Sequence, residues 1–168
     1  MVNYWLMITA DFENVAELQP QGGCDDPSFY YLFKLKCGSC GELTEKETCV
    51  ALERSAQIPG SKRTANLVQK CKFCEREGTV SLVTGKGKPL TQGLSEARKY
   101  TGLMMFDCRG YEPVGFLFQG GWTVETVAGT TFEDVDLSDG EFMEYDDKGK
   151  CSVMISNLKS RFVVAKWK

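Results

Sequence analysis

Two short cysteine motifs carry the clearest chemistry in this sequence. Cys37 and Cys40 form one CxxC pair, and Cys71 and Cys74 form another. A CxxC pair on a tight turn brings two sulfurs within reach of one ion, and Gly41 permits a sharp turn whose backbone N–H groups point at the sulfurs. Four thiolates in a tetrahedron suit Zn²⁺ and leave no position open for water or substrate. The spacing therefore predicts one structural zinc ion per chain, held by these four cysteines.

Two other uses of paired thiols stay open at this point. A thioredoxin-type redox pair opens a helix after a strand, and neither CxxC motif is followed by helical periodicity. An iron–sulfur centre takes the same four thiolates, and spacing does not distinguish it from zinc. Residues 41–70 separate the two pairs. This spacer is longer than the roughly 15–20 residues of the commonest zinc pattern, but antiparallel β-ribbon sites accept such an excursion.

The remaining cysteines form no comparable motif. They are Cys24, Cys49, Cys108 and Cys151. None has a partner at metal-binding spacing, so we expect free thiols that pack as small apolar side chains. Arg109 could activate Cys108 as a nucleophile. However, the chain contains no histidine, which excludes Ser-His-Asp and Cys-His catalysis and removes the usual base near neutral pH. We therefore expect a strand end at Cys108 and no enzymatic activity.

The elements that position these motifs are short. Apolar and aromatic residues gather in runs of strand length, at residues 4–12, 29–36, 79–83, 102–108, 151–156 and 161–167. Phe33 and Leu35 alternate with lysines, which is the pattern of a strand with one wet face, and this strand leads directly to Cys37. Only residues 94–100 predict a short helix. We therefore expect an all-β fold of antiparallel sheets.

An internal repeat relates the two halves of the chain. A shift of 98 residues places residues 21–23 (Gln-Gly-Gly) on residues 119–121 (Gln-Gly-Gly), and an apolar run precedes each segment. A duplicated β-sheet unit would produce this match. Short glycine-rich turns also match by chance, so duplication and coincidence both stay open from these residues alone.

Charge is unevenly distributed along the chain. The 20 basic and 23 acidic residues give a net charge of −3, which argues against a general polyanion binder. Residues 54–88 contain eight Lys or Arg and two acidic residues, whereas residues 125–147 contain nine acidic residues and no basic one. We interpret the acidic stretch as a solvated face of the protein.

The N-terminal residues lack the basic start and apolar core of a signal peptide. No apolar run reaches the length of about 18 residues that a membrane span requires. We therefore expect a protein of the cytoplasm, with the nucleus as a second compartment, that does not bind membranes. In such reducing compartments cysteines persist as thiols or metal ligands.

Four segments together resemble a known family. Residues 36–42 and 69–74 hold the CxxC pairs, residues 108–114 read CRGYEPV, and residues 129–137 lie in the acidic stretch. This combination resembles the eukaryotic CXXC motif-containing zinc-binding protein family over nearly the whole chain. The departures from the family pattern are Cys24, Cys49, Cys151, Gly115 and Phe118.

The resemblance implies a fold and a site but little function. It implies zinc held by Cys37, Cys40, Cys71 and Cys74 in an all-β protein with two similar halves, of which only the first binds metal. It also implies no established enzymatic activity. We therefore expect residues 1–168 to form a single compact unit of antiparallel sheets in two pseudo-symmetric halves, with a zinc-binding half at residues 1–92 and a metal-free half at residues 93–168.

Three functions are compatible with these observations. The first is a non-enzymatic adaptor, in which zinc fixes the two cysteine turns and the surface around them binds a protein partner. The second is a single-stranded nucleic-acid module with Phe73 as a stacking platform, along the basic residues Lys62, Arg63, Lys70, Lys72 and Arg76. The third is a thiol-based redox or metal-handling protein. We expect a protein partner rather than nucleic acid, because the acidic residues would repel a polyanion.

Overall fold

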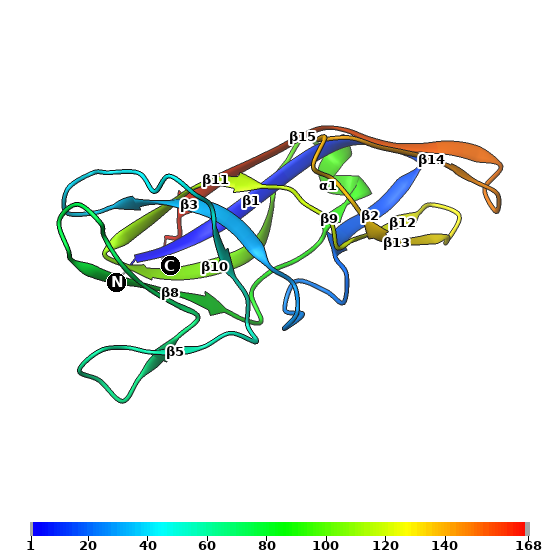
Figure 1. Cartoon of the computed structure of the whole chain (residues 1–168). Helices are drawn as coiled ribbons and strands as arrows, with labels where there is room; N and C mark the ends of the chain where they lie inside the picture. Colours follow the sequence, from blue (N-terminus) through cyan, green and yellow to red (C-terminus); the bar gives the residue numbers. More distant parts are fainter. Residues whose placement is uncertain (1, 167–168) are drawn as a thin grey trace.

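The computed structural model describes residues 2–166, and strands dominate them (Figure 1). Every strand pair is antiparallel. The expected all-β, antiparallel fold is therefore confirmed. Among the described residues, no helix has the length and apolar character needed to cross a membrane.

The largest sheet has six strands. In order across the sheet they are β14 (Phe142–Asp146), β15 (Cys151–Val164), β1 (Val2–Glu13), β10 (Thr101–Arg109), β8 (Glu77–Val83) and β7 (Leu67–Lys70). The long strands β1 and β10 lie at its centre, and two hairpins, β14–β15 and β7–β8, form its edges.

Three smaller sheets complete the fold. One has the order β11 (Tyr111–Leu117), β3 (Tyr31–Cys37), β4 (Thr48–Val50), and another has the order β13 (Thr131–Val135), β12 (Trp122–Thr126), β2 (Val15–Pro20), β9 (Leu90–Thr91). A two-stranded ribbon contains β5 (Ala56–Gln57) and β6 (Thr64–Ala65), and a single short helix, α1, spans Gln92–Glu96 in the described chain.

The strand orders are symmetric. If β1, β2, β3, β4, β7 and β8 exchange places with β10, β11, β12, β13, β14 and β15 respectively, the six-stranded sheet keeps the same order read from its other edge. The same exchange turns the β11-β3-β4 sheet into β2-β12-β13. The two halves are therefore pseudo-symmetric, and each of the three larger sheets combines strands from both halves. The repeated Gln-Gly-Gly segments occupy equivalent positions, after β2 and after β11, and the Gln21 N–H donates to the Gly121 carbonyl at 2.8 Å.

Aromatic side chains hold the β3 sheet against the six-stranded sheet. Alternate residues of β3 are buried, as the sequence pattern predicts, and Phe33 has no exposed surface. The centroid of its ring lies 5.2 Å from that of Phe106 on β10 and 5.6 Å from that of Phe162 on β15. Full burial of such a side chain contributes about 2–3 kcal/mol to folding. This packing fixes the direction in which β3 delivers Cys37 to the end of the sheet.

Two predicted strands are one strand in the structure. The runs at residues 151–156 and 161–167 both fall on β15, which continues between them to Val164. Asn157 has a φ of +52°, and the pairing of β15 with β1 shifts register near this point. The polar residues between the two apolar runs therefore lie at a β-bulge within one continuous strand. Trp167, the last residue of the second run, lies outside the described residues.

The predicted helix at residues 94–100 was placed too late in the chain. Helix α1 begins after Thr91, whose hydroxyl accepts the Leu94 N–H at 3.3 Å as an N-cap. The helix ends before Arg98, which has a φ of +57°. Residues 97–100 therefore lead into β10 rather than continue the helix.

Gly78 lies where the chain leaves no room for a side chain. A Cβ on Gly78 of β8 would lie 2.3 Å from the Tyr111 ring on β11 and 2.6 Å from the Arg109 carbonyl oxygen. We expect Gly78→Ala to lower the free energy of unfolding by about 1–3 kcal/mol. The control is Gly93→Ala, since a Cβ on Gly93 of α1 meets nothing within 4 Å and alanine favours the helix by up to about 1 kcal/mol. Urea unfolding measures both, and equal effects would contradict the close approach.

Candidate metal centre

The two CxxC motifs lie on turns that belong to different sheets. Cys37 is the last residue of β3, and Cys40 follows it on the turn after that strand. Cys71 and Cys74 lie on the turn between β7 and β8. The turn of Cys37 is closed by its own N–H, which donates to the Glu42 carbonyl at 2.9 Å, and that of Cys71 by the same kind of bond to Arg76, also at 2.9 Å. The two turns therefore present their cysteines in the same way.

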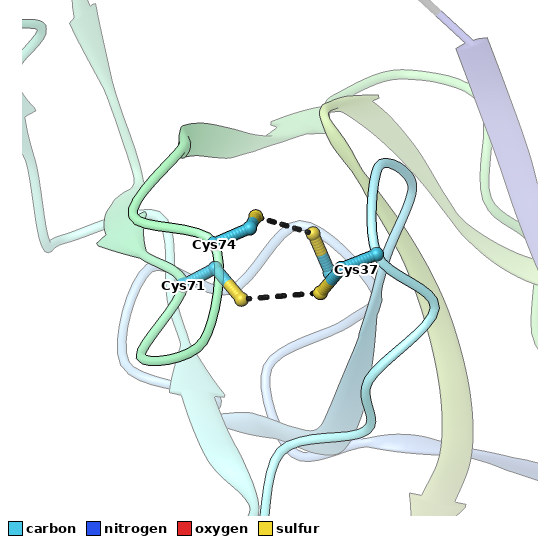
Figure 2. Close-up of side chains that lie close together, drawn as sticks. Cys37, Cys71 and Cys74 are labelled. Carbon is cyan, nitrogen blue, oxygen red and sulfur yellow. Dashed lines mark hydrogen bonds between the residues drawn. The ribbon is translucent and has the colours of Figure 1, made fainter.

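The structure brings the four predicted sulfurs together. All four lie within 4.8 Å of one another. Among the described residues, they are the one group of three or more His, Cys, Asp or Glu side chains that could hold a metal ion. Two close contacts run across the two turns: the Cys37 Sγ lies 3.6 Å from the Cys74 Sγ (Figure 2), and the Cys40 Sγ lies 3.7 Å from the Cys71 Sγ. A tetrahedron of sulfurs each about 2.3 Å from zinc has edges of about 3.8 Å. The arrangement thus has the size that zinc requires.

Backbone N–H groups surround the sulfurs. In each pair, the first cysteine accepts N–H groups from the residues three and two positions later, which lower the pKa of Cys37 to about 6 and also lower that of Cys71. The second cysteine of each pair accepts one N–H from two positions later. There, burial and the neighbouring thiols outweigh this bond and raise the pKa of Cys40 to about 12, as well as that of Cys74. Two of the four sulfurs are therefore stabilised as thiolates by the turns themselves.

The CRGYEPV segment lies between the two turns. Gly110 accepts the Gly38 N–H at 2.9 Å, and a Cβ on Gly110 would lie 3.3 Å from the Glu77 carbonyl oxygen on the other side. Tyr111 pairs with Cys37 across β3 and β11. Burial, together with the cysteine sulfurs, raises the pKa of Tyr111 to about 12. No local spacing pattern placed Gly110, Tyr111 or Gly78 at the site. The glycine within the CRGYEPV segment was the one sequence feature that pointed to it.

The other cysteines stay apart from this cluster and are free thiols. Cys108 is buried within β10, and burial followed by the nearby Asp107 carboxylate raises its pKa to about 12. Burial also raises the pKa of Cys24 to about 12. The neutral thiol is thus favoured at Cys108, in the direction opposite to an activated nucleophile.

A groove lies beside the four sulfurs, with a volume of about 310 Å³. Its walls are residues 42–48, which follow the first CxxC pair, and residues 69–73, which include part of the second. Leu43 and Phe73 line it and are 46% and 63% exposed. Tyr111 also lines it, and the tyrosine hydroxyl is buried without a hydrogen-bond partner among the described residues. Both walls are thus directly attached to the cysteine turns.

Charges of both signs line the groove. Glu42, Glu45, Lys46 and Glu47 lie on one wall, and Lys70 and Lys72 lie on the other. Of the basic residues predicted to form a nucleic-acid rim, Lys70 and Lys72 therefore join Phe73 at the groove. Lys62, Arg63 and Arg76 are not part of its lining.

Comparison with known proteins decides the family. The model of a family described as CXXC motif containing zinc binding protein, eukaryotic, matches residues 5–163. The chain belongs to this family. Members of it in Bos taurus and Homo sapiens are 36% and 35% identical over 159 residues, covering 94% of this chain and 96% of theirs.

Solved structures share the fold of this member of the CXXC zinc-binding family. The crystal structure of C1orf123 matches with a TM-score of 0.88 and 34% identity, covering 97% of this chain and 99% of that one. A hypothetical protein from Plasmodium falciparum has the same fold, with a TM-score of 0.82 at 24% identity. The resemblance inferred from the sequence motifs is thus confirmed, and the four clustered cysteines account for the zinc-binding name.

The C-terminal half joins its two equivalent turns by a different interaction. The turn after β12 and the turn between β14 and β15 correspond to the two cysteine turns under the exchange of strands. Asp146 is structurally equivalent to Cys71, because each residue lies at the start of the turn in its edge hairpin. In the same way, Lys150 (φ +51°) is equivalent to Glu75 (φ +64°). Asp146 is buried and accepts the hydroxyls of Thr126 at 2.7 Å and Thr130 at 2.5 Å. One carboxylate therefore joins the two turns that four sulfurs join in the other half.

Removal of the metal should loosen one end of the molecule. We expect a chelator to speed amide exchange in residues 37–48 and 69–77, because the cluster is what joins these turns, whereas β1 and β10 keep their protection at the centre of the sheet. Hydrogen exchange read by mass spectrometry measures this. Uniform loss of protection across the chain would show instead that the fold is one cooperative unit that depends on the metal.

The carboxylate clamp should be sensitive to acid. The hydroxyls of Thr130 and Thr126 lower the pKa of Asp146, so its stabilisation is present above the pKa of an unfolded carboxyl, about 3.9, and is lost as the pH falls through the lower folded value. We expect Asp146→Asn to lower the melting temperature at pH 7 by roughly several degrees and to flatten its decline in acid. The exposed neighbour variant Asp147→Asn is the control. Identical melting curves for both variants would contradict the clamp.

Proposed function

We propose that the protein is a non-enzymatic adaptor built on one structural zinc ion. Cys37, Cys40, Cys71 and Cys74 supply four thiolates, which fill a tetrahedral zinc site and leave no coordination position for a substrate. The groove beside them is the surface that binds a segment of another protein. The observation that carries the proposal is the attachment of both groove walls to the cysteine turns.

Zinc and groove are coupled through the chain itself. Phe73 lies inside the second CxxC pair, between two ligands, so its position depends on how that turn is held. Leu43 lies on the segment that follows Cys40 and is likewise close to a ligand in sequence. Metal binding restricts the motion of both segments, so less conformational entropy is lost when a partner binds.

The lining indicates what kind of segment fits. Exposed Leu43 and Phe73 favour an apolar anchor, because burial of such side chains dominates interface energies. The Tyr111 hydroxyl, which has no hydrogen-bond partner in the described part of the chain, favours a hydrogen-bonding group near that anchor. Three carboxylates and one lysine on one wall, and two lysines on the other, favour flanking charges of both signs.

The two other candidate functions have less support. A nucleic acid in the groove would meet Lys70 and Lys72 but also three glutamates on the opposite wall, and these repel phosphates. A redox pair requires two thiols that react without further ligands, whereas here all four Sγ atoms lie within 4.8 Å of one another in one cluster.

Affinity capture from cell extract, combined with zinc analysis, tests the proposal. The wild type should carry one zinc per chain and capture partners. Phe73→Ser should keep the zinc and weaken capture by roughly tenfold or more, and Cys71→Ser should lose both. Val127→Ser is the matched control, because Val127 is 49% exposed in the other half and its replacement should change neither.

Three results would contradict the proposal. Zinc-free protein with full folding, or iron in its place, would remove the structural zinc. Unchanged capture by Phe73→Ser would place the docking surface elsewhere. Submicromolar binding of random single-stranded RNA, abolished by Phe73→Ser, would favour the nucleic-acid module instead.

A further inference from the structure

The edge strand β14 has an open side. It ends the six-stranded sheet, and β15 is its one neighbour among the described strands. On its outer side, no backbone hydrogen bond to another described residue satisfies its N–H and C=O groups. Figure 1 shows the β14–β15 hairpin, in orange and red, at the end of the molecule away from the green β7–β8 turn. Such an edge is a template for another strand.

One face of β14 is apolar and exposed. Met143 and Tyr145 alternate along the strand and therefore share a face, and they are 65% and 55% exposed. Half-buried Met154 pairs with Met143 from β15 and extends this face. On the opposite face, Phe142 packs on Phe132, with the ring centroids 5.6 Å apart. Protein edges usually carry charges that discourage pairing. In β14 the one charged exposed residue, Glu144, alternates with Met143 and Tyr145 and lies on the other face, so this face presents two large apolar side chains.

The surroundings of this edge are acidic. Three exposed acidic residues lie on or beside the strand: Glu141 just before β14, Glu144 within it and Asp147 just after it. Glu13 of β1 pairs with Met154 and so borders the same face. The nearest lysines in sequence, at positions 148 and 150, lie on the turn beyond the strand. A strand that adds here experiences a negative field, which favours a basic segment.

We propose that β14 is a second docking site, which takes a basic, extended segment of a partner protein as an added strand. Backbone hydrogen bonds to β14 would supply affinity. Alternate apolar side chains on Met143 and Tyr145, and basic ones beside Glu144, would supply specificity. The site lies in the metal-free half and does not depend on the groove beside the cysteines.

A second copy of this chain is the less suitable occupant. Pairing of β14 with β14 would bring equivalent Glu144 carboxylates together. The opposite edge of the sheet, β7, is followed by basic residues, but β5 contacts it. The Asn66 side chain just before β7 also accepts the Leu82 N–H and donates to the Arg54 carbonyl, which ties this edge to its neighbours. These contacts leave β7 less open than β14.

Peptide binding to the zinc-loaded full chain tests the proposal. The probe is a short capped peptide of alternating lysine and valine, and the matched peptide has glutamate in place of lysine. We expect the lysine peptide to bind and the glutamate peptide not to bind. The bound lysine peptide should slow amide exchange in residues 142–146, and its affinity should fall as the salt concentration rises. Glu144→Lys should reduce its affinity by about tenfold. Met143→Thr should also reduce it, while removing no charge.

The controls lie at the other end of the molecule. Glu47→Lys reverses an exposed charge in the groove, and Phe73→Ser removes the groove anchor; neither should change binding of the lysine peptide. If Glu47→Lys weakens it as much as Glu144→Lys does, the attraction is non-specific and the proposal is wrong. Protection of residues 42–48 instead of 142–146, equal binding of both peptides, absence of binding, or dimerisation that Met143→Thr abolishes would also overturn it.

Discussion

The four-sulfur cluster is the interaction on which one end of this molecule depends. Cys37 ends a strand of the small β11-β3-β4 sheet and Cys40 lies on the turn after it, whereas Cys71 and Cys74 lie on a hairpin of the six-stranded sheet. A metal ion held by all four thus links the two sheets at this end of the molecule. Gly110 lies between the two turns, where a Cβ would lie 3.3 Å from the Glu77 carbonyl oxygen and so would fit tightly. Zinc sites of this kind contribute folding energy outright.

The pseudo-symmetry gives the fold a second clamp of different chemistry. Asp146 joins the turn after β12 to the β14–β15 hairpin through two threonine hydroxyls, and so links the other small sheet to the same six-stranded sheet. The metal clamp requires deprotonated thiolates, and chelators can remove the metal. The carboxylate clamp requires only that the pH lie above the pKa of the carboxyl group. The pseudo-symmetric frame therefore supports two ends that differ in charge and in surface: a groove of mixed charge at one, an acidic open edge at the other.

The sequence predicted the cluster because its information is local. CxxC spacing places two sulfurs on one turn, and the alternation of Phe33 and Leu35 with lysines predicts the strand that carries Cys37. The contribution of Tyr111 was not predictable in this way, because it depends on the register of β11 against β3, which is set by contacts across distant segments. The single strand β15 was also missed, since the bulge at Asn157 interrupts the hydrophobic pattern without ending the strand. Asp146 and Cys71 share a position but no chemistry, so the repeat is visible in the sequence only at its glycine-rich turns.

X-ray absorption at the zinc edge of the purified protein tests the central claim most directly, because it counts and identifies the atoms bound to the metal. The account predicts four sulfur neighbours at about 2.3 Å and no oxygen or nitrogen neighbour. A first shell that contains oxygen or nitrogen would mean an open site with a position for substrate. An absorption edge from iron rather than zinc would likewise contradict the structural zinc clamp.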